Sequence, residues 1–219
     1  MRVETFAADA LPGRGAIWIA DRVWSALAER GVAHVAVSGG HTPVAMLRAL
    51  NGLPLPWDRL HIWQVDERVA PDGHPDRNAT DLVAALPSRS LHLMPVTADD
   101  LEAAAAEYAS ELAAACGGVL DVVHLGLGDD GHTASWPPGD PVIGVTDRNV
   151  AVVGPFHERL RMTLTVSAVN RARLCMVLVA GADKADAVAK MLARDRSVPA
   201  GHLPADALVL SDPAALASQ

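Results

Sequence analysis

The stretch HLGLGDDGHTASWPPG (residues 124–139) follows an apolar run and supports two incompatible interpretations. Gly126, Gly128 and Gly131 fit the G-x-G-x-x-G pattern that opens a dinucleotide-binding α/β unit. The same stretch carries two consecutive aspartates and a histidine, an acid–base set that does not suit the neighbourhood of a pyrophosphate. The choice between these interpretations decides which kind of α/β protein this is.

The dinucleotide interpretation fails on three counts. The two aspartates would repel a pyrophosphate. A helix should begin after Gly131, but Pro137 and Pro138 follow within about two turns. The acidic residue expected about 20 positions further on, at the end of the next strand, is absent, because Asp147 precedes that strand. We therefore expect no nucleotide cofactor, and the loop itself becomes a candidate for chemistry.

Around this stretch, apolar runs alternate with helical patterns along the chain, without an internal repeat or an obvious linker. Strands that alternate with helices of about ten residues predict right-handed βαβ crossovers. We expect a single doubly wound α/β domain over residues 1–219, with a mostly parallel sheet and helices on both faces. The first helix is expected to bury a face formed by Ile17, Ala20, Trp24 and Leu27. The expected strands lie at 32–40, 61–68, 91–96, 119–128, 149–154, 161–166, 174–181 and 207–212, and the expected helices at 16–31, 42–52, 78–86, 98–116 and 182–194.

Composition and charge restrict the partners. Half of the residues are hydrophobic and a fifth are charged, which is typical of a globular protein. The formal net charge of −8 disfavours nucleic acid and anionic membranes as partners. The start MRVETFAADA lacks the apolar core of a signal peptide, and no uncharged apolar run approaches the roughly 18 residues that span a bilayer. Cys116 and Cys175 lack CxxC spacing, so we expect reduced thiols in a cytoplasmic protein.

In a doubly wound sheet, ligands bind beyond the carboxyl ends of the strands, and SGGHTP (38–43) is the first such segment. Gly39 and Gly40 let the backbone turn with its N–H groups exposed. Thr42 as N-cap and Pro43 at the first helical position then start a helix. Exposed N–H groups beside a helix N-terminus suit a phosphate, but the spacing is not that of a Walker A loop. A plain strand-to-helix turn has the same glycines, so both interpretations stay open.

The segment DER (66–68) follows the next expected strand. Asp66 and Arg68 alternate to one side of an extended chain and could face a pocket, while Glu67 points away. A solvated charge cluster is the alternative. In the loop that follows, His74 lies near two aspartates, but a loop with Pro and Gly holds metal ligands poorly. We expect no metal site.

Two further segments supply a candidate base and two cations. His132 follows the carboxylate of Asp130 by two residues, which favours a general base oriented by an acid; a structural histidine is the alternative. The motifs G-x-S-x-G and H-E-x-x-H do not occur, which disfavours a serine hydrolase or a zincin. Lys184 lies in the first turn of a helix, where the dipole disfavours a cation, so a phosphate contact is one role for it. Arg161 begins a strand. A snorkelling lysine and a surface arginine are the alternatives.

Five segments run in order over residues 38–188: SGGHTP, DERVAP…N, LGLGDDGHTASWPPG, RMTLT and AGADKADAV. Together they resemble the 6-phosphogluconolactonase family, within a wider group that includes glucosamine-6-phosphate isomerases. The resemblance implies a cytoplasmic hydrolase of the pentose phosphate pathway that opens 6-phospho-D-glucono-1,5-lactone to 6-phosphogluconate. It also implies no cofactor, no required metal and no partner other than the small-molecule lactone.

Carried over by position, the resemblance implies a catalytic centre and a phosphate site. We expect neutral His132 to take a proton from the water that attacks the lactone carbonyl, and Arg68 to stabilise the oxyanion. Either Asp130 or Asp66 orients the imidazole. Arg77 stands where the family pattern has serine and is expected to add a cation. His41 also departs from the pattern, which has a small or hydroxyl residue there. The phosphate site comprises Gly39, Gly40, His41, Thr42, Arg161 and Lys184.

Two other functions stay open. The first is an aldose–ketose isomerase or deaminase of an amino-sugar phosphate, whose motif D-G-H-x-A-F-N-E-P-G includes a glutamate that assists ring opening. Pro137 stands in that place here and cannot transfer a proton, so hydrolysis is favoured. The second is a non-catalytic sugar-phosphate-binding protein, because a fold alone does not determine function.

Overall fold

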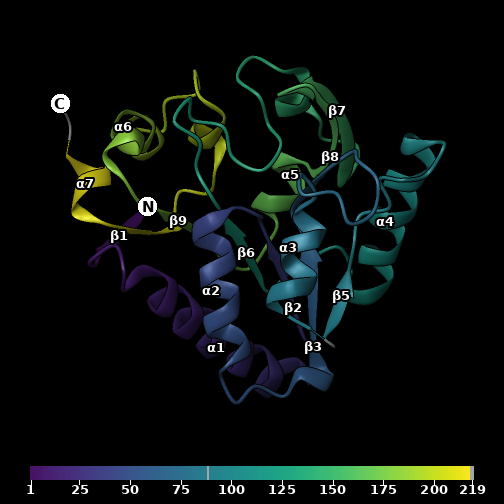
Figure 1. Ribbon diagram of the computed structural model, residues 1–219, viewed down its shortest axis with the longest axis horizontal. Helices are drawn as coiled ribbons and strands as arrows, with labels where there is room; N and C mark the ends of the chain where they lie inside the picture. Colours follow the sequence, from purple (N-terminus) through teal and green to yellow (C-terminus); the bar gives the residue numbers. More distant parts are fainter. Residues whose placement is uncertain (88, 218–219) are drawn as a thin grey trace.

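A parallel sheet of seven strands runs through the centre of the molecule in the computed structural model, which describes residues 1–87 and 89–217 (Figure 1). Every pair of neighbouring strands in this main sheet is parallel. The doubly wound, mostly parallel arrangement expected from the alternating pattern is confirmed. In order across the sheet, the strands are β1 (Arg2–Thr5), β10 (Leu208–Ser211), β9 (Cys175–Val179), β6 (Val122–Leu125), β2 (Ala33–Val37), β3 (Leu60–Gln64) and β5 (Ser90–His92).

Helices cover both faces of the main sheet, as expected. They are α1 (Leu11–Arg30), α2 (His41–Asn51), α3 (Asn78–Ala85), α4 (Leu101–Cys116), α5 (Val166–Asn170), α6 (Ala185–Leu192) and α7 (Pro213–Leu216). Successive residues of a strand point to opposite faces, so each buried strand contributes to two cores. Val35 and Val37 of β2 belong to the core formed with α1, α2 and α3, whereas Ala36 belongs to the core formed with α4 and α6.

The face that α1 buries differs from the expected one. Ile17 is 50% exposed and Trp24 is 49% exposed, while the other two expected residues are buried and Val23 is fully buried. The buried face is centred on Ile19, Val23 and Ala26 instead. It approaches α2 closely at one point, where a Cβ on Gly15 would come within 2.8 Å of the sulfur of Met46.

The first two strands expected after the histidine loop, at 149–154 and 161–166, lie outside the main sheet. β7 (Val150–Phe156) and β8 (Arg159–Leu164) form an antiparallel hairpin, and β4 (Asp66–Arg68) pairs with β8 to complete a second sheet. The turn between β7 and β8 is too short for a crossover helix, so the strands pair antiparallel. β4 belongs to this sheet because the strand expected over 61–68 is interrupted at Val65. The second sheet stands at the upper right of Figure 1.

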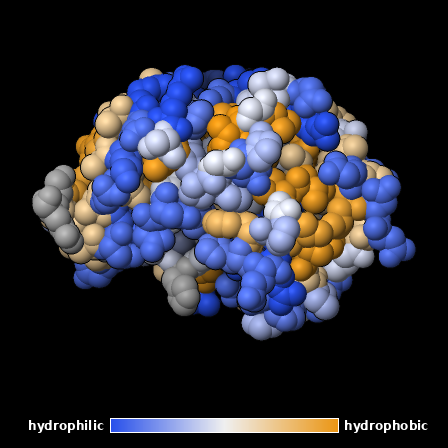
Figure 2. Space-filling view, turned by 90° about the horizontal axis from the view of Figure 1, so that it is seen from above, coloured by the Kyte–Doolittle hydropathy of each residue, from blue (hydrophilic) through white to orange (hydrophobic). Residues whose placement is uncertain are grey.

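The face seen from above carries a hydrophobic area at one side. Figure 2 views the molecule from above and shows hydrophobic residues gathered on the right, the side of β7, β8 and α4 in Figure 1.

Within the described residues, no helix combines the length and apolarity that crossing a membrane requires. Cys116 and Cys175 are both free cysteines.

Candidate active site

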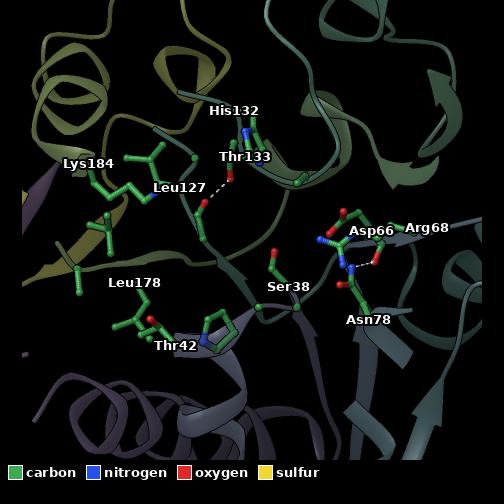
Figure 3. Close-up of a pocket in the computed structure, with 18 of the residues that line it drawn as sticks. Ser38, Thr42, Asp66, Arg68, Asn78, Leu127, His132, Thr133, Leu178 and Lys184 are labelled. Carbon is green, nitrogen blue, oxygen red and sulfur yellow. Dashed lines mark hydrogen bonds between the residues drawn. The ribbon is translucent and has the colours of Figure 1, made fainter. Parts of the chain in front are cut away.

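The order of the strands reverses between β2 and β6. From β2 the chain continues to β3 and β5 on one side of the sheet, and from β6 it continues to β9 and β10 on the other. Such a reversal separates the loops that follow the two strands and leaves a crevice where ligands bind. A cavity of about 380 Å³ opens here and is lined by residues from all four strand-end segments that the sequence indicated (Figure 3).

The cavity brings together most of the predicted site residues. Asp130 does not line the cavity but contacts His132, which does. Arg77 does not line it either, and the side chain of His41 lies outside the described residues. In Figure 3, Lys184 stands on one side, Asp66 and Arg68 stand on the other, and His132 lies between them at the top. The predicted residues that line the cavity are Gly39, Gly40, Thr42, Asp66, Arg68, His132, Arg161 and Lys184.

The loop after β2 presents backbone N–H groups to the cavity. α2 begins at His41 and is capped by Gly40, so the expectation of Thr42 as N-cap was wrong. Gly40 adopts a φ of 110°, which favours glycine, and turns the chain directly into the helix. No described side chain caps α2, so the N–H groups of its first turn remain available to a ligand. A Cβ on Gly39 would lie 2.2 Å from Oδ1 of Asn78, so only glycine fits there.

The two cations predicted to bind phosphate, Lys184 and Arg161, line the cavity from different elements. Lys184 directly precedes α6, and its Nζ lies 3.2 Å from the neighbouring carboxylate of Asp183. Arg161 lies on β8, and its Nε donates to the carbonyl oxygen of Phe156 at 3.1 Å. Burial lowers the pKa of Arg161, and the negative charge of Asp66 opposes this shift. Lys184 therefore approaches from the main sheet and Arg161 from the second sheet.

β4 brings Asp66 and Arg68 to the wall formed by the second sheet. Both side chains line the cavity, as the alternation along an extended strand predicts. The carboxyl group of Asp66 is buried, and its Oδ2 accepts a hydrogen bond from Oγ of Ser135 at 2.6 Å. Burial raises the pKa of Asp66, against the effects of the Ser135 hydrogen bond and the Arg161 charge. Nη1 of Arg68 donates to the backbone oxygen of Asp76 at 2.9 Å, which holds the guanidinium from behind.

A buried ion pair supports this wall. Glu67 does not line the cavity, as expected, yet it is fully buried rather than solvated. It accepts hydrogen bonds of 2.8 Å from the backbone N–H groups of Asn78 and Ala79 at the start of α3, where the helix dipole favours an anion. Arg77 instead places its Nε 3.1 Å from Oε2 of Glu67. The expectation that Arg77 adds a cation to the cavity was wrong, because the buried carboxylate needs a cation beside it.

The loop after β6 places an imidazole and a carboxylate side by side. Oδ1 of Asp130 accepts a hydrogen bond from the backbone N–H of His132 at 2.9 Å and lies 2.6 Å from its Nδ1. Partial burial acts to raise the pKa of Asp130, but the hydrogen bonds from His132 outweigh it and lower that pKa. A Cβ on Gly128 would lie 2.1 Å from Nδ1, so this glycine makes room for the pair. Of the two carboxylates considered for orienting the imidazole, Asp130 makes the contact, and Nε2 is the nitrogen left for a ligand.

Two residues that were not predicted contact predicted site residues. Ser135 binds Asp66, and it could have been found because it stands inside the histidine motif. The ring of Phe156 lies edge-to-face with the ring of His132 at a centroid distance of 5.1 Å. The same ring lies 5.0 Å from the guanidinium carbon of Arg161. No pattern in the sequence indicated Phe156, because only the pairing of β7 with β8 brings it to the site.

These groups suit an anionic substrate that undergoes proton transfer. The helix N-terminus and the two cations can hold a phosphate, since charge-assisted hydrogen bonds favour this anion. An imidazole held by a carboxylate can take a proton from water. In the described part of the chain, no group of three or more His, Cys, Asp or Glu is arranged to hold a metal ion.

Comparisons with known proteins agree with this arrangement. The model of the family described as glucosamine-6-phosphate isomerases/6-phosphogluconolactonase matches residues 7–211. A 6-phosphogluconolactonase from Synechocystis is 38% identical over 192 residues, which cover 82% of this chain and 80% of the relative. A 6-phosphogluconolactonase from Streptomyces coelicolor is 39% identical over 195 residues, which cover 78% of this chain and 74% of the relative.

Solved structures share the fold over nearly the whole chain. The crystal structure of 6-phosphogluconolactonase from Thermotoga maritima matches with a TM-score of 0.87 at 25% identity, covering 96% of this chain and 98% of that one. A monomeric glucosamine-6-phosphate deaminase matches with a TM-score of 0.85 at 21% identity, covering 99% of this chain and 100% of that one. Proteins named for different activities therefore share this fold, and the site has to distinguish between them.

Proposed function

This chain belongs to the family of glucosamine-6-phosphate isomerases and 6-phosphogluconolactonases, and we propose that it hydrolyses 6-phospho-D-glucono-1,5-lactone to 6-phospho-D-gluconate. This is a step of the pentose phosphate pathway. Relatives 38% and 39% identical over most of the chain carry the name of this activity. One observation carries the proposal: the Asp130–His132 pair faces the same cavity as Arg161, Lys184 and the N-terminus of α2.

In the proposed mechanism His132 is the general base. A δ-lactone has an activated carbonyl, so neither a covalent nucleophile nor a metal is needed. Nε2 of neutral His132 takes a proton from water as the water oxygen bonds to C1, and Asp130 stabilises the imidazolium through Nδ1–H. When the intermediate collapses, the bond from C1 to the ring oxygen breaks and Nε2 returns the proton to that oxygen. The products are a hydroxyl group and a carboxylic acid, which ionises.

Arg68 is the proposed partner of the developing oxyanion. Its guanidinium lines the cavity and is already held by the backbone oxygen of Asp76 at 2.9 Å. A cation fixed before the reaction stabilises the transition state without reorganising. Asp66, beside it on β4, lies next to the sugar ring in this proposal.

The phosphate of the substrate binds the loop 39–42 in this proposal, with Arg161 and Lys184 as its cations. Support comes from the uncapped first turn of α2 and from two cations that line the cavity from different elements, Arg161 from β8 and Lys184 from the position before α6. Each charge-assisted hydrogen bond is worth about 1.5–3 kcal/mol, so the phosphate supplies much of the affinity. We extend the proposal to a cytoplasmic location, which two free cysteines support.

The residue at position 137, a proline, favours hydrolysis over isomerisation. Isomerisation of an amino-sugar phosphate needs an acid that assists ring opening, and proline can neither give nor take a proton. Pro137 also does not line the cavity. Conversion of glucosamine 6-phosphate to fructose 6-phosphate at the rate of an ordinary enzyme would contradict the proposal.

The deciding experiment follows hydrolysis of freshly prepared lactone by the purified protein against the spontaneous rate at the same pH. We expect a rate proportional to protein concentration and well above the spontaneous one. Tight binding of 6-phosphogluconate without acceleration would instead identify a non-catalytic sugar-phosphate-binding protein. Gluconolactone without the phosphate serves as the control substrate and should react far more slowly.

A further inference from the structure

Ser135 connects the histidine loop to the wall that carries Asp66. Its side chain is fully buried, and its Oγ donates to Oδ2 of Asp66 at 2.6 Å, a short distance even for a hydroxyl bound to a carboxylate. The two residues lie 69 positions apart in the sequence. Among the described residues, Ser135 is the one whose side chain hydrogen-bonds this carboxyl group.

The backbone of Ser135 is held as well. Its N–H donates to Oγ1 of Thr163 at 3.3 Å, and that hydroxyl donates onward to the backbone oxygen of Leu164. Thr163 lies opposite Asp66 in the pairing of β4 with β8. The indole Nε1 of Trp136 donates to the same backbone oxygen of Leu164 at 2.7 Å. Ser135 is therefore fixed on both sides, and its hydroxyl has little freedom to turn toward the cavity.

The second oxygen of the carboxyl group has a different environment. No described residue hydrogen-bonds Oδ1 of Asp66, and this atom is not among the enclosed polar atoms that lack a partner. Because Asp66 lines the cavity, Oδ1 is the oxygen that a ligand can reach. Burial disfavours the ionised carboxylate, and so does the negative charge of Glu67, whereas the positive charges of Arg161 and Arg68 favour it.

We propose that Ser135 is a positioning residue, whose hydroxyl occupies Oδ2 of Asp66 and so presents Oδ1 to the cavity as the acceptor for a sugar hydroxyl that the lactone and 6-phosphogluconate share. This inference rests on the proposed function, since it assigns a contact to the same sugar phosphate. The Ser135 hydrogen bond stabilises the charged carboxylate and does not stabilise the neutral acid as well. Without it, the buried carboxyl group takes up a proton at a higher pH, and a neutral acid accepts a hydrogen bond less strongly.

The test measures the affinity for 6-phosphogluconate by calorimetry between pH 5 and pH 8. Compared with the wild type, Ser135→Ala should bind about 10-fold more weakly at the acidic end, and the difference should shrink toward pH 8 as the carboxyl group of the variant ionises. Ser135→Thr keeps the hydroxyl and should restore the pH dependence of the wild type. Ser135→Cys, with a weak donor, should shift the profile partway and replaces Ser135→Ala if that variant does not fold.

Two controls separate this role from a merely structural one. Ser211→Ala removes a hydroxyl that is also fully buried but has no hydrogen-bond partner among the described residues, and should leave the profile unchanged. In an Asp66→Asn background, Ser135→Ala should add no pH-dependent loss, because no carboxyl group remains at position 66 to take up a proton. An unchanged profile in Ser135→Ala, or an equal loss at every pH, overturns the inference while the proposed function stands. A wild-type protein that neither binds 6-phosphogluconate nor hydrolyses the lactone overturns the proposed function instead.

Discussion

Two histidine–carboxylate pairs lie on the main sheet or at its end, and their surroundings differ. In the first pair, Oδ1 of Asp130 lies 2.6 Å from Nδ1 of His132, which lines the cavity. In the second, Oε1 of Glu111 on α4 lies 2.5 Å from Nδ1 of His92 on β5. By distance alone the two pairs are equivalent.

The other ring nitrogen distinguishes the pairs. Nε2 of His92 lies 2.9 Å from Nδ1 of His61, and the His92 ring stacks on Trp63 at 3.8 Å. Both nitrogens of His92 are therefore engaged by the protein, whereas Nε2 of His132 is left for a ligand. A histidine–carboxylate contact thus does not define a catalytic site. In the proposed function, the cavity and the cations around it distinguish the catalytic pair from the structural one.

The largest expected effect is at His132. General-base catalysis is worth about 10²–10⁴-fold, so His132→Ala should lower kcat by that order while the affinity for 6-phosphogluconate persists. The matched variant is His92→Gln, which removes the other carboxylate-paired histidine and should leave kcat within about two-fold of the wild type. Steady-state kinetics on the lactone checks both. Near-full activity in His132→Ala would show that the base lies elsewhere, and His41 would be the next residue to test.

The cation nearest to the proposed oxyanion comes next. Loss of one preorganised donor to an oxyanion typically costs about 10²–10³-fold in kcat, so Arg68→Ala should fall in this range. Its effect on KM should be smaller, because the oxyanion forms only in the transition state. Arg148→Ala, which changes an exposed arginine, is the control. A change in KM alone would place Arg68 in substrate binding and remove it from the chemistry.

Lys184 should affect binding more than chemistry. Removing one charge-assisted phosphate contact should raise KM about 10- to 100-fold in Lys184→Ala, with a small change in kcat. Lys190→Ala, on the exposed side of α6, removes a lysine paired with Asp186 and should behave like the wild type. The loss in Lys184→Ala should vanish on gluconolactone, which lacks the phosphate. An equal loss on both substrates would contradict a phosphate contact.

The smallest expected effect is a loss of folding stability at acid pH, caused by two buried histidines away from the cavity. Burial lowers the pKa of His34 to about 4 and of His124 to about 3, from an ordinary value of 6.5. Below pH 6.5 the unfolded chain therefore binds protons that the folded chain does not, so the free energy of unfolding falls as the pH falls. At pH 5 each of these histidines should lower the free energy of unfolding by about 2 kcal/mol relative to neutral pH.

Urea unfolding at pH 7 and pH 5 measures this loss. His34→Gln removes one of these two histidines, so the variant should lose about 2 kcal/mol less than the wild type between these pH values, whatever its absolute stability. The comparison of the two differences removes the effect of the substitution itself. Identical losses in both proteins would mean that His34 takes up its proton in the folded state as readily as in the unfolded one.

The parts of the site that could be predicted are those with local signals. A strand, a glycine turn and a helix start lie within a few residues at Gly39 and Gly40, and the alternation of Asp66 and Arg68 follows from the geometry of one strand. Asp130 and His132 are two residues apart. Each of these signals fits inside one segment of the chain, so the pattern of residues contains it.

The parts that could not be predicted depend on contacts between distant segments. Arg77 turns inward because Glu67 is buried beneath it, and nothing in the pattern shows that burial. Phe156 reaches His132 only through the hairpin of β7 and β8. The second sheet itself was missed, because an apolar run predicts a strand without identifying its neighbour. The same limit led to the wrong face of α1, where Trp24 is exposed.

The pairing of β4 with β8 sets Arg68 directly opposite Arg161, and both guanidinium groups line the same cavity. Like charges opposite one another on antiparallel strands destabilise the sheet that holds them. In the proposed function this local destabilisation serves binding, because the anionic substrate acts as a counterion for both arginines. In a population selected for heat resistance alone, one of these two arginines should be among the first residues replaced, and the replacement should cost activity.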